Sequence, residues 1–188
     1  MTKVFVADIA LLDEDLTAYR DRISEYRQQK IKNLKKPDDQ KRALLAELLL
    51  AKYLGRKPRY TLNDDGKPLG EETEFSFSHS GNIVLCAVSD ATVGADVEKV
   101  REIGLDVAKR FAKDEYEAIV SSQNPQDEFF KLWVKKESFL KMIGNGIKGG
   151  LDTRIDENYT YTMCEEVAGY KICVCAKEPA EIEFVKEI

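Results

Sequence analysis

The sequence has little of what marks a zinc, membrane or secreted protein. It contains one histidine and four cysteines, and no two cysteines form a Cys-x-x-Cys pair. These spacings fit no zinc pattern, so we expect buried free thiols at Cys86, Cys164, Cys173 and Cys175. The longest apolar run, 43–50, is interrupted by Glu47 and is far shorter than the roughly 20 residues that span a bilayer. The amino terminus has no basic segment before an apolar one, so we expect no secretory signal and a cytoplasmic protein.

The chain also lacks an excess of basic charge. Its 29 Lys and Arg against 34 Asp and Glu give a formal net charge of −5, which argues against a general nucleic-acid binder. The basic residues are nevertheless unevenly distributed, because many fall in one short region: Arg27, Lys30, Lys32, Lys35, Lys36, Lys41 and Arg42. Such a basic region in an acidic protein predicts a localised anionic ligand.

What the 188 residues do contain is a mixture of helical and strand periodicity, with 43% hydrophobic and 34% charged residues. The expected strands are 3–9, 75–78, 83–88 and 93–98, with three more between 153 and 185. The expected helices are 13–26, 41–54, 105–111, 114–120 and 127–142. The strands between 75 and 98 predict an antiparallel meander, and the whole pattern predicts an α+β fold of one domain or two small ones.

The stretch from Gly94 to Arg101 puts two carboxylates into one predicted strand. Alternate strand residues share a face, so Asp96 and Glu98 project to one side while Ala95 and Val97 point into a core. A cation between the two carboxylates would relieve their repulsion, and Mg²⁺ prefers oxygen ligands that it shares with phosphates. A solvated face on an amphipathic strand explains the same alternation, and both interpretations stay open from the strand alone.

The predicted helix 127–142 carries a third carboxylate of interest. A spacing of four places Trp133, Glu137 and Lys141 along one ridge. Glu137 is either a further ligand of the cation, with Lys141 as a phosphate contact, or the partner of Lys141 in an ordinary ion pair between successive turns. Spacing alone does not decide between these alternatives.

His79, the single histidine, lies between two serines at the end of a predicted strand. It is either a structural histidine or one of several donors that meet phosphate oxygens there. A nucleophilic pair of His79 with a neighbouring serine is disfavoured, because adjacent strand residues face opposite ways.

Three motifs follow one another along the chain: Ser78-His79-Ser80, then the stretch 93–99, then Trp133-Val134-Lys135-Lys136-Glu137-Ser138-Phe139-Leu140-Lys141. In this order and spacing they closely resemble the 4′-phosphopantetheinyl transferases, specifically the longer, monomeric subfamily that activates peptide and polyketide synthases. Gly66-Lys67-Pro68 and the basic region 27–42 extend the resemblance over most of the chain. It implies an α+β monomer of two pseudo-symmetric lobes, 1–100 and 101–188, each a small antiparallel sheet packed with helices.

The resemblance also implies a reaction. The phosphopantetheine arm of coenzyme A is transferred to a serine of an apo acyl or peptidyl carrier protein, and adenosine 3′,5′-bisphosphate is released; no nucleic acid or membrane takes part. By motif position, Mg²⁺ or Mn²⁺ would be held by Asp96, Glu98 and Glu137. Coenzyme A would be bound by Arg27, Lys30, Arg42, Lys67, Ser78, His79 and Lys141. Glu137 is our first choice as general base and Glu115 the second, with Lys141 reaching the pyrophosphate.

The chain departs from the subfamily pattern in three places. Arg27 replaces a lysine, which keeps the charge and changes the phosphate geometry. The connection from Pro68 to Phe75 is short, and the carboxyl-terminal strands are expected to end early. The alternative from another class is a non-catalytic module that binds coenzyme A or a carrier protein, against which the retention of all three acidic positions argues. A metal-dependent phosphodiesterase is a third interpretation.

Overall fold

The computed structural model describes residues 1–64, 66–144 and 150–188. Its helices are α1 (Glu25–Lys32), α2 (Pro37–Leu54), α3 (Lys113–Ser121) and α4 (Pro125–Ile143), with short 3₁₀ helices at Ile9–Leu11, Leu16–Arg22 and Leu105–Arg110. Its strands are β1 (Thr2–Asp8), β2 (Tyr60–Leu62), β3 (Pro68–Gly70), β4 (Glu74–Ser80), β5 (Ile83–Ser89), β6 (Gly94–Lys99), β7 (Thr160–Cys164), β8 (Tyr170–Ala176) and β9 (Ala180–Phe184). The expected α+β class is confirmed.

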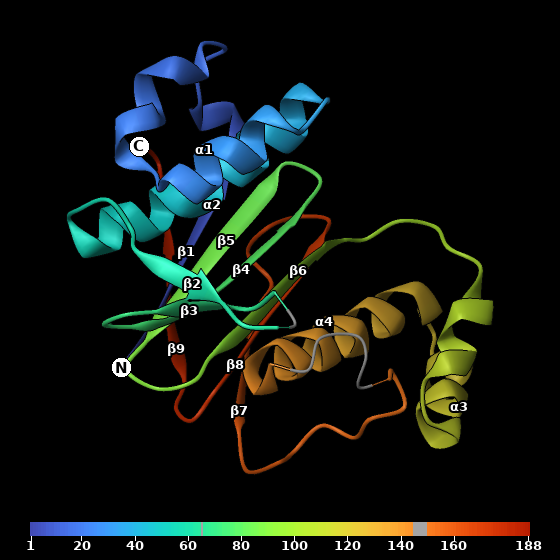
Figure 1. The fold of residues 1–188 in the computed structure, drawn as a ribbon. Helices are drawn as coiled ribbons and strands as arrows, with labels where there is room; N and C mark the ends of the chain where they lie inside the picture. The colour runs from blue at the N-terminus through green and yellow to red at the C-terminus, as the bar shows by residue number, and fades with distance from the viewer. Residues whose placement is uncertain (65, 145–149) are drawn as a thin grey trace.

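Two sheets form the centre of the fold (Figure 1). The first has the strand order β4-β5-β1-β9, in which β9 runs parallel to β1 and the other pairs are antiparallel. The second is antiparallel, in the order β6-β8-β7, and a separate two-stranded ribbon joins β2 to β3. Since β9 comes from the second half of the chain and pairs with the first strand, the two halves share a sheet. The lobe boundary at residue 100 stays a prediction.

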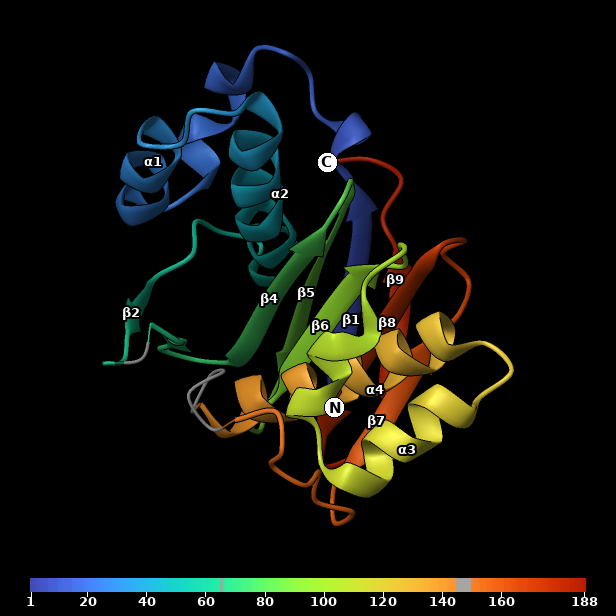
Figure 2. The same ribbon diagram turned by 90° about the vertical axis from the view of Figure 1, so that its right-hand side faces the viewer.

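The core is divided by the alternation of side chains in β1. Phe5 and Ala7 pack with the leucines of α2, whereas Val4 and Val6 pack with β6 and β8 in the core that the two sheets share. Helix α4 covers the second sheet by packing against β6 and β8, and Figure 2 shows it on the opposite side of the molecule from α1 and α2. The cavity described below lies between these two groups of helices.

Two expectations about secondary structure were wrong. The strands between 75 and 98 do not form a three-stranded meander, because β4 and β5 make a hairpin while β6 pairs with β8. The expected helix 13–26 is instead a 3₁₀ helix that ends at the buried Ile23, followed by α1, whose first turn is capped by Ser24.

Other expectations agree with the structure. Helix α2 begins with Pro37 in its first turn and ends at Gly55, whose φ of 66° is left-handed. All four cysteines are buried and free. Within residues 1–64, 66–144 and 150–188, no helix is both long enough and apolar enough to cross a membrane.

Gly94, at the start of β6, allows α4 to approach the sheet closely. A Cβ at this position would collide with the carbonyl oxygen of Ser138 and the backbone of Met142. Because Glu137 and Lys141 lie on the same stretch of α4, the absence of a side chain at Gly94 sets their distance from Asp96.

Candidate active site

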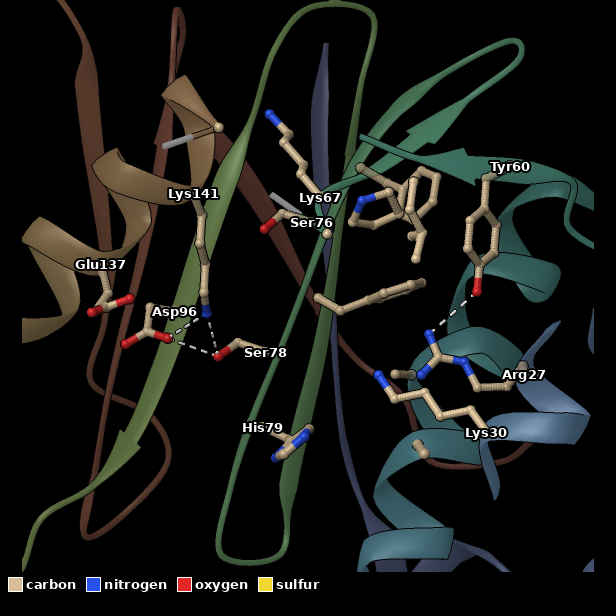
Figure 3. Close-up of a pocket in the computed structure, with 18 of the residues that line it drawn as sticks. Arg27, Lys30, Tyr60, Lys67, Ser76, Ser78, His79, Asp96, Glu137 and Lys141 are labelled. Carbon is tan, nitrogen blue, oxygen red and sulfur yellow. Dashed lines mark hydrogen bonds and ion pairs between the residues drawn. The ribbon is translucent and has the colours of Figure 1, made fainter. Parts of the chain in front are cut away.

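A cavity of about 620 Å³ opens between α1, α2 and β4 on one side and β6 and α4 on the other (Figure 3). Its lining includes most of the residues that the sequence suggested as ligand contacts: Arg27, Lys30, Lys67, Ser78, His79, Asp96, Glu98, Glu137 and Lys141. Trp133 and Tyr60 line it as well. Figure 3 shows the carboxylates on the side of α4 and the guanidinium of Arg27 on the side of α1, so the cavity has one acidic and one basic wall.

The acidic wall is formed by Asp96 and Glu98 on β6 and Glu137 on α4. Asp96 is 5% exposed, and its Oδ1 accepts hydrogen bonds from Ser78 Oγ (2.8 Å) and Lys141 Nζ (2.7 Å). Glu98 Oε2 accepts from Ser80 Oγ at 2.9 Å. The other Asp96 oxygen, Oδ2, and Glu137 Oε1 are both buried without a hydrogen-bond partner among the described residues. Buried carboxylate oxygens of this kind are costly unless a positive group faces them.

Lys141 settles one of the alternatives left open by the sequence. Its ammonium donates to Asp96 Oδ1, to Ser78 Oγ (2.9 Å) and to the carbonyl oxygen of Ala95 (3.2 Å). In the described part of the chain, the ion pair of Lys141 is therefore with Asp96 on the neighbouring strand β6, and an ordinary pair with Glu137 on the same helix is not formed.

Glu137 is a carboxyl group whose surroundings favour the protonated form. Burial raises its pKa, and the negative charge of Asp96 raises it further, with a smaller contribution from Glu98. The charge of Lys141 acts in the opposite direction. A cation between the carboxylates would lower this pKa again.

The donor set at this wall fits a hard cation. Two buried carboxylate oxygens without partners are the ligand type that Mg²⁺ and Mn²⁺ prefer. In the described ranges, which omit 65 and 145–149, no three His, Cys, Asp or Glu side chains are grouped closely enough to hold a metal ion. The expected ligand set of Asp96, Glu98 and Glu137 therefore stays a prediction.

The basic wall depends on a carboxylate that the sequence reading missed. Glu47, in the middle of α2, is fully buried and accepts from Arg27 Nε (2.8 Å), Tyr60 OH (3.0 Å) and the backbone N–H of Ser24 (2.8 Å). The guanidinium of Arg27 also lies 5.4 Å from the ring centroid of Phe77. Burial raises the pKa of Tyr60 to about 12, so its phenol stays protonated and donates to Glu47. The sequence feature that could have predicted this role is a glutamate inside an otherwise apolar helix.

Three further groups bring positive charge or donors to the cavity. Burial lowers the pKa of Lys30, and the neighbouring charge of Arg27 lowers it further. Burial likewise lowers the pKa of Lys67, whose Nζ donates to the carbonyl oxygen of Met142 at 2.8 Å and so connects the β2–β3 segment to the end of α4. Burial and then the charges of Arg42 and Lys141 lower the pKa of His79. An anion bound among these groups would favour their charged forms.

Two expected site residues lie outside the lining of this cavity. Arg42 donates to the carbonyl oxygen of Gly81 (2.7 Å) and pairs with Asp39, so it holds the turn that follows Ser80. Glu115 accepts from the N–H of Ala112 and pairs with Nζ of the buried Lys136 at 2.9 Å, which joins α3 to α4. The structure does not bring either residue to the acidic and basic walls, and their expected roles stay predictions.

Comparisons with known proteins identify relatives of this chain. The family model for the 4′-phosphopantetheinyl transferase superfamily matches residues 92–177, which include β6 and α4. The 4′-phosphopantetheinyl transferase Sfp of Bacillus subtilis is 30% identical over 201 residues, which cover 92% of this chain and 90% of the relative. The 4′-phosphopantetheinyl transferase psf-1 of Bacillus pumilus is 32% identical over 180 residues, covering 79% and 76%. The corresponding enzyme gsp of Aneurinibacillus migulanus is 36% identical over 153 residues, covering 75% and 65%.

Proposed function

The chain belongs to the 4′-phosphopantetheinyl transferase family, and from this premise we propose that it transfers the phosphopantetheine arm of coenzyme A to a serine of an apo acyl or peptidyl carrier protein, with Mg²⁺ as cofactor. Adenosine 3′,5′-bisphosphate is the second product. The observation that carries the proposal is that one cavity has an acidic wall and, opposite it, a basic wall. A pyrophosphate ligand needs both walls, because its negative charge is neutralised by the cationic side chains of the basic wall and by a metal that the carboxylates of the acidic wall would hold.

The basic wall receives the nucleotide end of coenzyme A in this proposal. Lys30, His79 and Arg27, which line the cavity, contact its phosphates, and Lys67 lies beside the adenine. The hydrogen bonds that Arg27 donates to Glu47 and Tyr60 hold its guanidinium in one orientation before the ligand arrives. Such preorganisation reduces the entropy lost on binding.

The acidic wall holds Mg²⁺ through Asp96, Glu98 and Glu137 in this proposal. When bound, the metal would supply positive charge to the pyrophosphate as negative charge develops there. Lys141 adds a second positive charge on the same wall, and it would exchange one of its three hydrogen bonds for a pyrophosphate oxygen. We further propose that the enzyme acts as a cytoplasmic monomer.

Glu137 is the general base of the proposed reaction. The carrier serine Oγ attacks the phosphorus that bears the pantetheine arm, the bond from that phosphorus to the bridging oxygen breaks, and the nucleotide leaves with the electron pair. Glu137 takes the serine proton. Burial and the neighbouring negative charges raise its pKa in the metal-free protein, whereas a bound metal ion would lower it.

The test is to incubate the protein with an apo carrier protein, coenzyme A and Mg²⁺ and to measure the phosphopantetheine addition by mass spectrometry. Glu137→Gln is expected to reduce the rate by about 100-fold or more. Glu128→Gln, the same exchange in the first turn of the same helix and outside the cavity lining, is the matched control. Chelation by EDTA is expected to stop transfer.

The outcomes separate the proposal from its alternatives. A non-catalytic module would bind coenzyme A or the carrier without any mass addition. A phosphodiesterase would cleave coenzyme A in the absence of carrier. Unchanged transfer by Glu137→Gln would refute the site assignment, and a panel of carriers from fatty-acid, polyketide and peptide synthesis would identify the substrate.

A further inference from the structure

Three serines of β4 bridge the line where the two sheets meet. β4 belongs to the first sheet and β6 to the second, and no strand ladder joins them. Instead the backbone N–H groups of β6 donate to serine hydroxyl oxygens: Ala95 N to Ser76 Oγ (3.1 Å), Val97 N to Ser78 Oγ (3.3 Å) and Lys99 N to Ser80 Oγ (3.0 Å). We call these three bonds the serine ladder. Both strands have a side-chain period of two, so the same contact recurs at every second residue.

Each hydroxyl of the serine ladder still has a hydrogen to donate, because the amide of β6 occupies only a lone pair of its oxygen. Ser78 Oγ lies 2.8 Å from Asp96 Oδ1, and Ser80 Oγ donates to Glu98 Oε2 at 2.9 Å. A carboxylate can only accept, so these hydrogens point to the carboxylates. Asp96 and Glu98 lie beside Ser78 and Ser80, and the corresponding residue of β6 beside Ser76 is Gly94. Among the described residues, Ser76 therefore forms no hydrogen bond to a carboxylate.

Ser80 offers the cleaner case of the two. Ser78 lines the cavity and also contacts Lys141, whereas Ser80 lies outside the cavity lining and donates to one lining residue, Glu98. Glu98 Oε2 also accepts from Nη1 of the exposed Arg101 at 3.2 Å. One oxygen of Glu98 is thus bonded away from the cavity, and the carboxylate is held in one orientation.

We propose that Ser80 is a positioning residue that orients Glu98 to bind the metal ion, and that the serine ladder is the device that aims both carboxylates of β6. This inference rests on the metal site in the proposed function. Partners of this kind fix the orientation of ligating carboxylates, and their removal typically weakens metal binding by about 10- to 100-fold. Ser80→Ala is therefore expected to weaken binding by about 10-fold or more.

The experiment measures Mn²⁺ binding to the full chain by electron paramagnetic resonance and Mg²⁺ binding by calorimetry, each with and without coenzyme A. Ser76→Ala is the matched control, because it removes the same kind of rung without touching a carboxylate. We expect its metal affinity to stay within about twofold of the wild type, since no ligand loses a partner. Ser80→Thr keeps the hydroxyl and is expected to restore most of the affinity. Melting temperatures of all variants report the structural cost of losing a rung.

A double variant shows whether Ser80 acts through Glu98. In a Glu98→Gln background, Ser80→Ala is expected to have no further effect on metal affinity. If Ser80→Ala does not fold, Ser80→Cys replaces it, because a thiol is similar in size and donates weakly.

Several results would overturn the inference. Wild-type metal affinity in Ser80→Ala would do so, as would an equal loss in Ser76→Ala, or a persistent loss in the Glu98→Gln background. A wild-type protein that binds neither Mn²⁺ nor Mg²⁺ would refute the metal site and this inference together. A wild type that binds metal and an unaffected Ser80 variant would refute the inference alone.

Discussion

Replacing Glu47 by alanine tests the buried support of the basic wall. The change removes three hydrogen bonds and leaves the guanidinium of Arg27, which is 7% exposed, without its charge partner. Breaking a buried ion pair by removing one partner costs about 3–5 kcal/mol. Since the free energy of unfolding of a domain is about 5–15 kcal/mol, this loss is a large share of it. At about 2–4 °C per kcal/mol for a chain of this size, the melting temperature should fall by about 6–20 °C.

The assay is thermal and urea unfolding of Glu47→Ala, Arg27→Met and the double variant. Because the unpaired charge of Arg27 causes most of the loss, the double variant should be less destabilised than the sum of the two single changes. Glu72→Ala is the matched control: it breaks the exposed pair with Arg56 and should cost less than about 1 kcal/mol. A loss below about 1 kcal/mol for Glu47→Ala, or additive single changes, would refute the reasoning.

Three further predictions concern the walls of the cavity and the α3–α4 contact. Gly94→Ala should displace α4 and reduce the transfer rate by about 100-fold, measured by mass spectrometry. Glu115→Gln should lower the melting temperature because the buried Lys136 loses its partner. If this variant lost more of the transfer rate than Glu137→Gln, the choice of Glu137 as general base would be contradicted. Burial lowers the folded-state pKa of His79 below 6.5, so the unfolded chain binds its proton more tightly. Stability should therefore fall below about pH 6.5 in the wild type and less in His79→Gln, as thermal melts would show.

From the local pattern of the sequence, α4 and several residues of the candidate site could be predicted. The ridge of Trp133, Glu137 and Lys141 lines one cavity, as expected from spacing, and the end of α4 at Gly144 follows from its left-handed φ of 80°. The basic region was expected to meet an anion, and Arg27 and Lys30 do line the cavity. Residue spacing, a terminal glycine and the clustering of basic residues, which are all local features of the sequence, were sufficient for these predictions.

Contacts between distant segments were not predictable in this way. β6 was expected to pair with the preceding strand, yet its partner β8 comes about 70 residues later, and the serine ladder takes the place of a strand ladder at β4. The partner of Lys141 is likewise Asp96 and not the glutamate one turn before it, because Gly94 brings α4 onto β6. The role of Glu47 depends on Arg27 and Tyr60, which lie 20 and 13 residues away in sequence.

The parallel pairing of β9 with β1 has a consequence for the order in which the sheet can form during synthesis. β1 is complete at Asp8, whereas its partner ends at Phe184, and Val185 then donates to the carbonyl oxygen of Val6 at 2.8 Å. At about 5–20 residues per second, a ribosome needs roughly 9–35 s to cover that interval. β5 is synthesised within this interval and can pair with one edge of β1, whereas the other edge has no partner until β9 is made. Within this sheet, β1 thus receives its second neighbour last, and until then its open edge can pair with other chains, which favours aggregation.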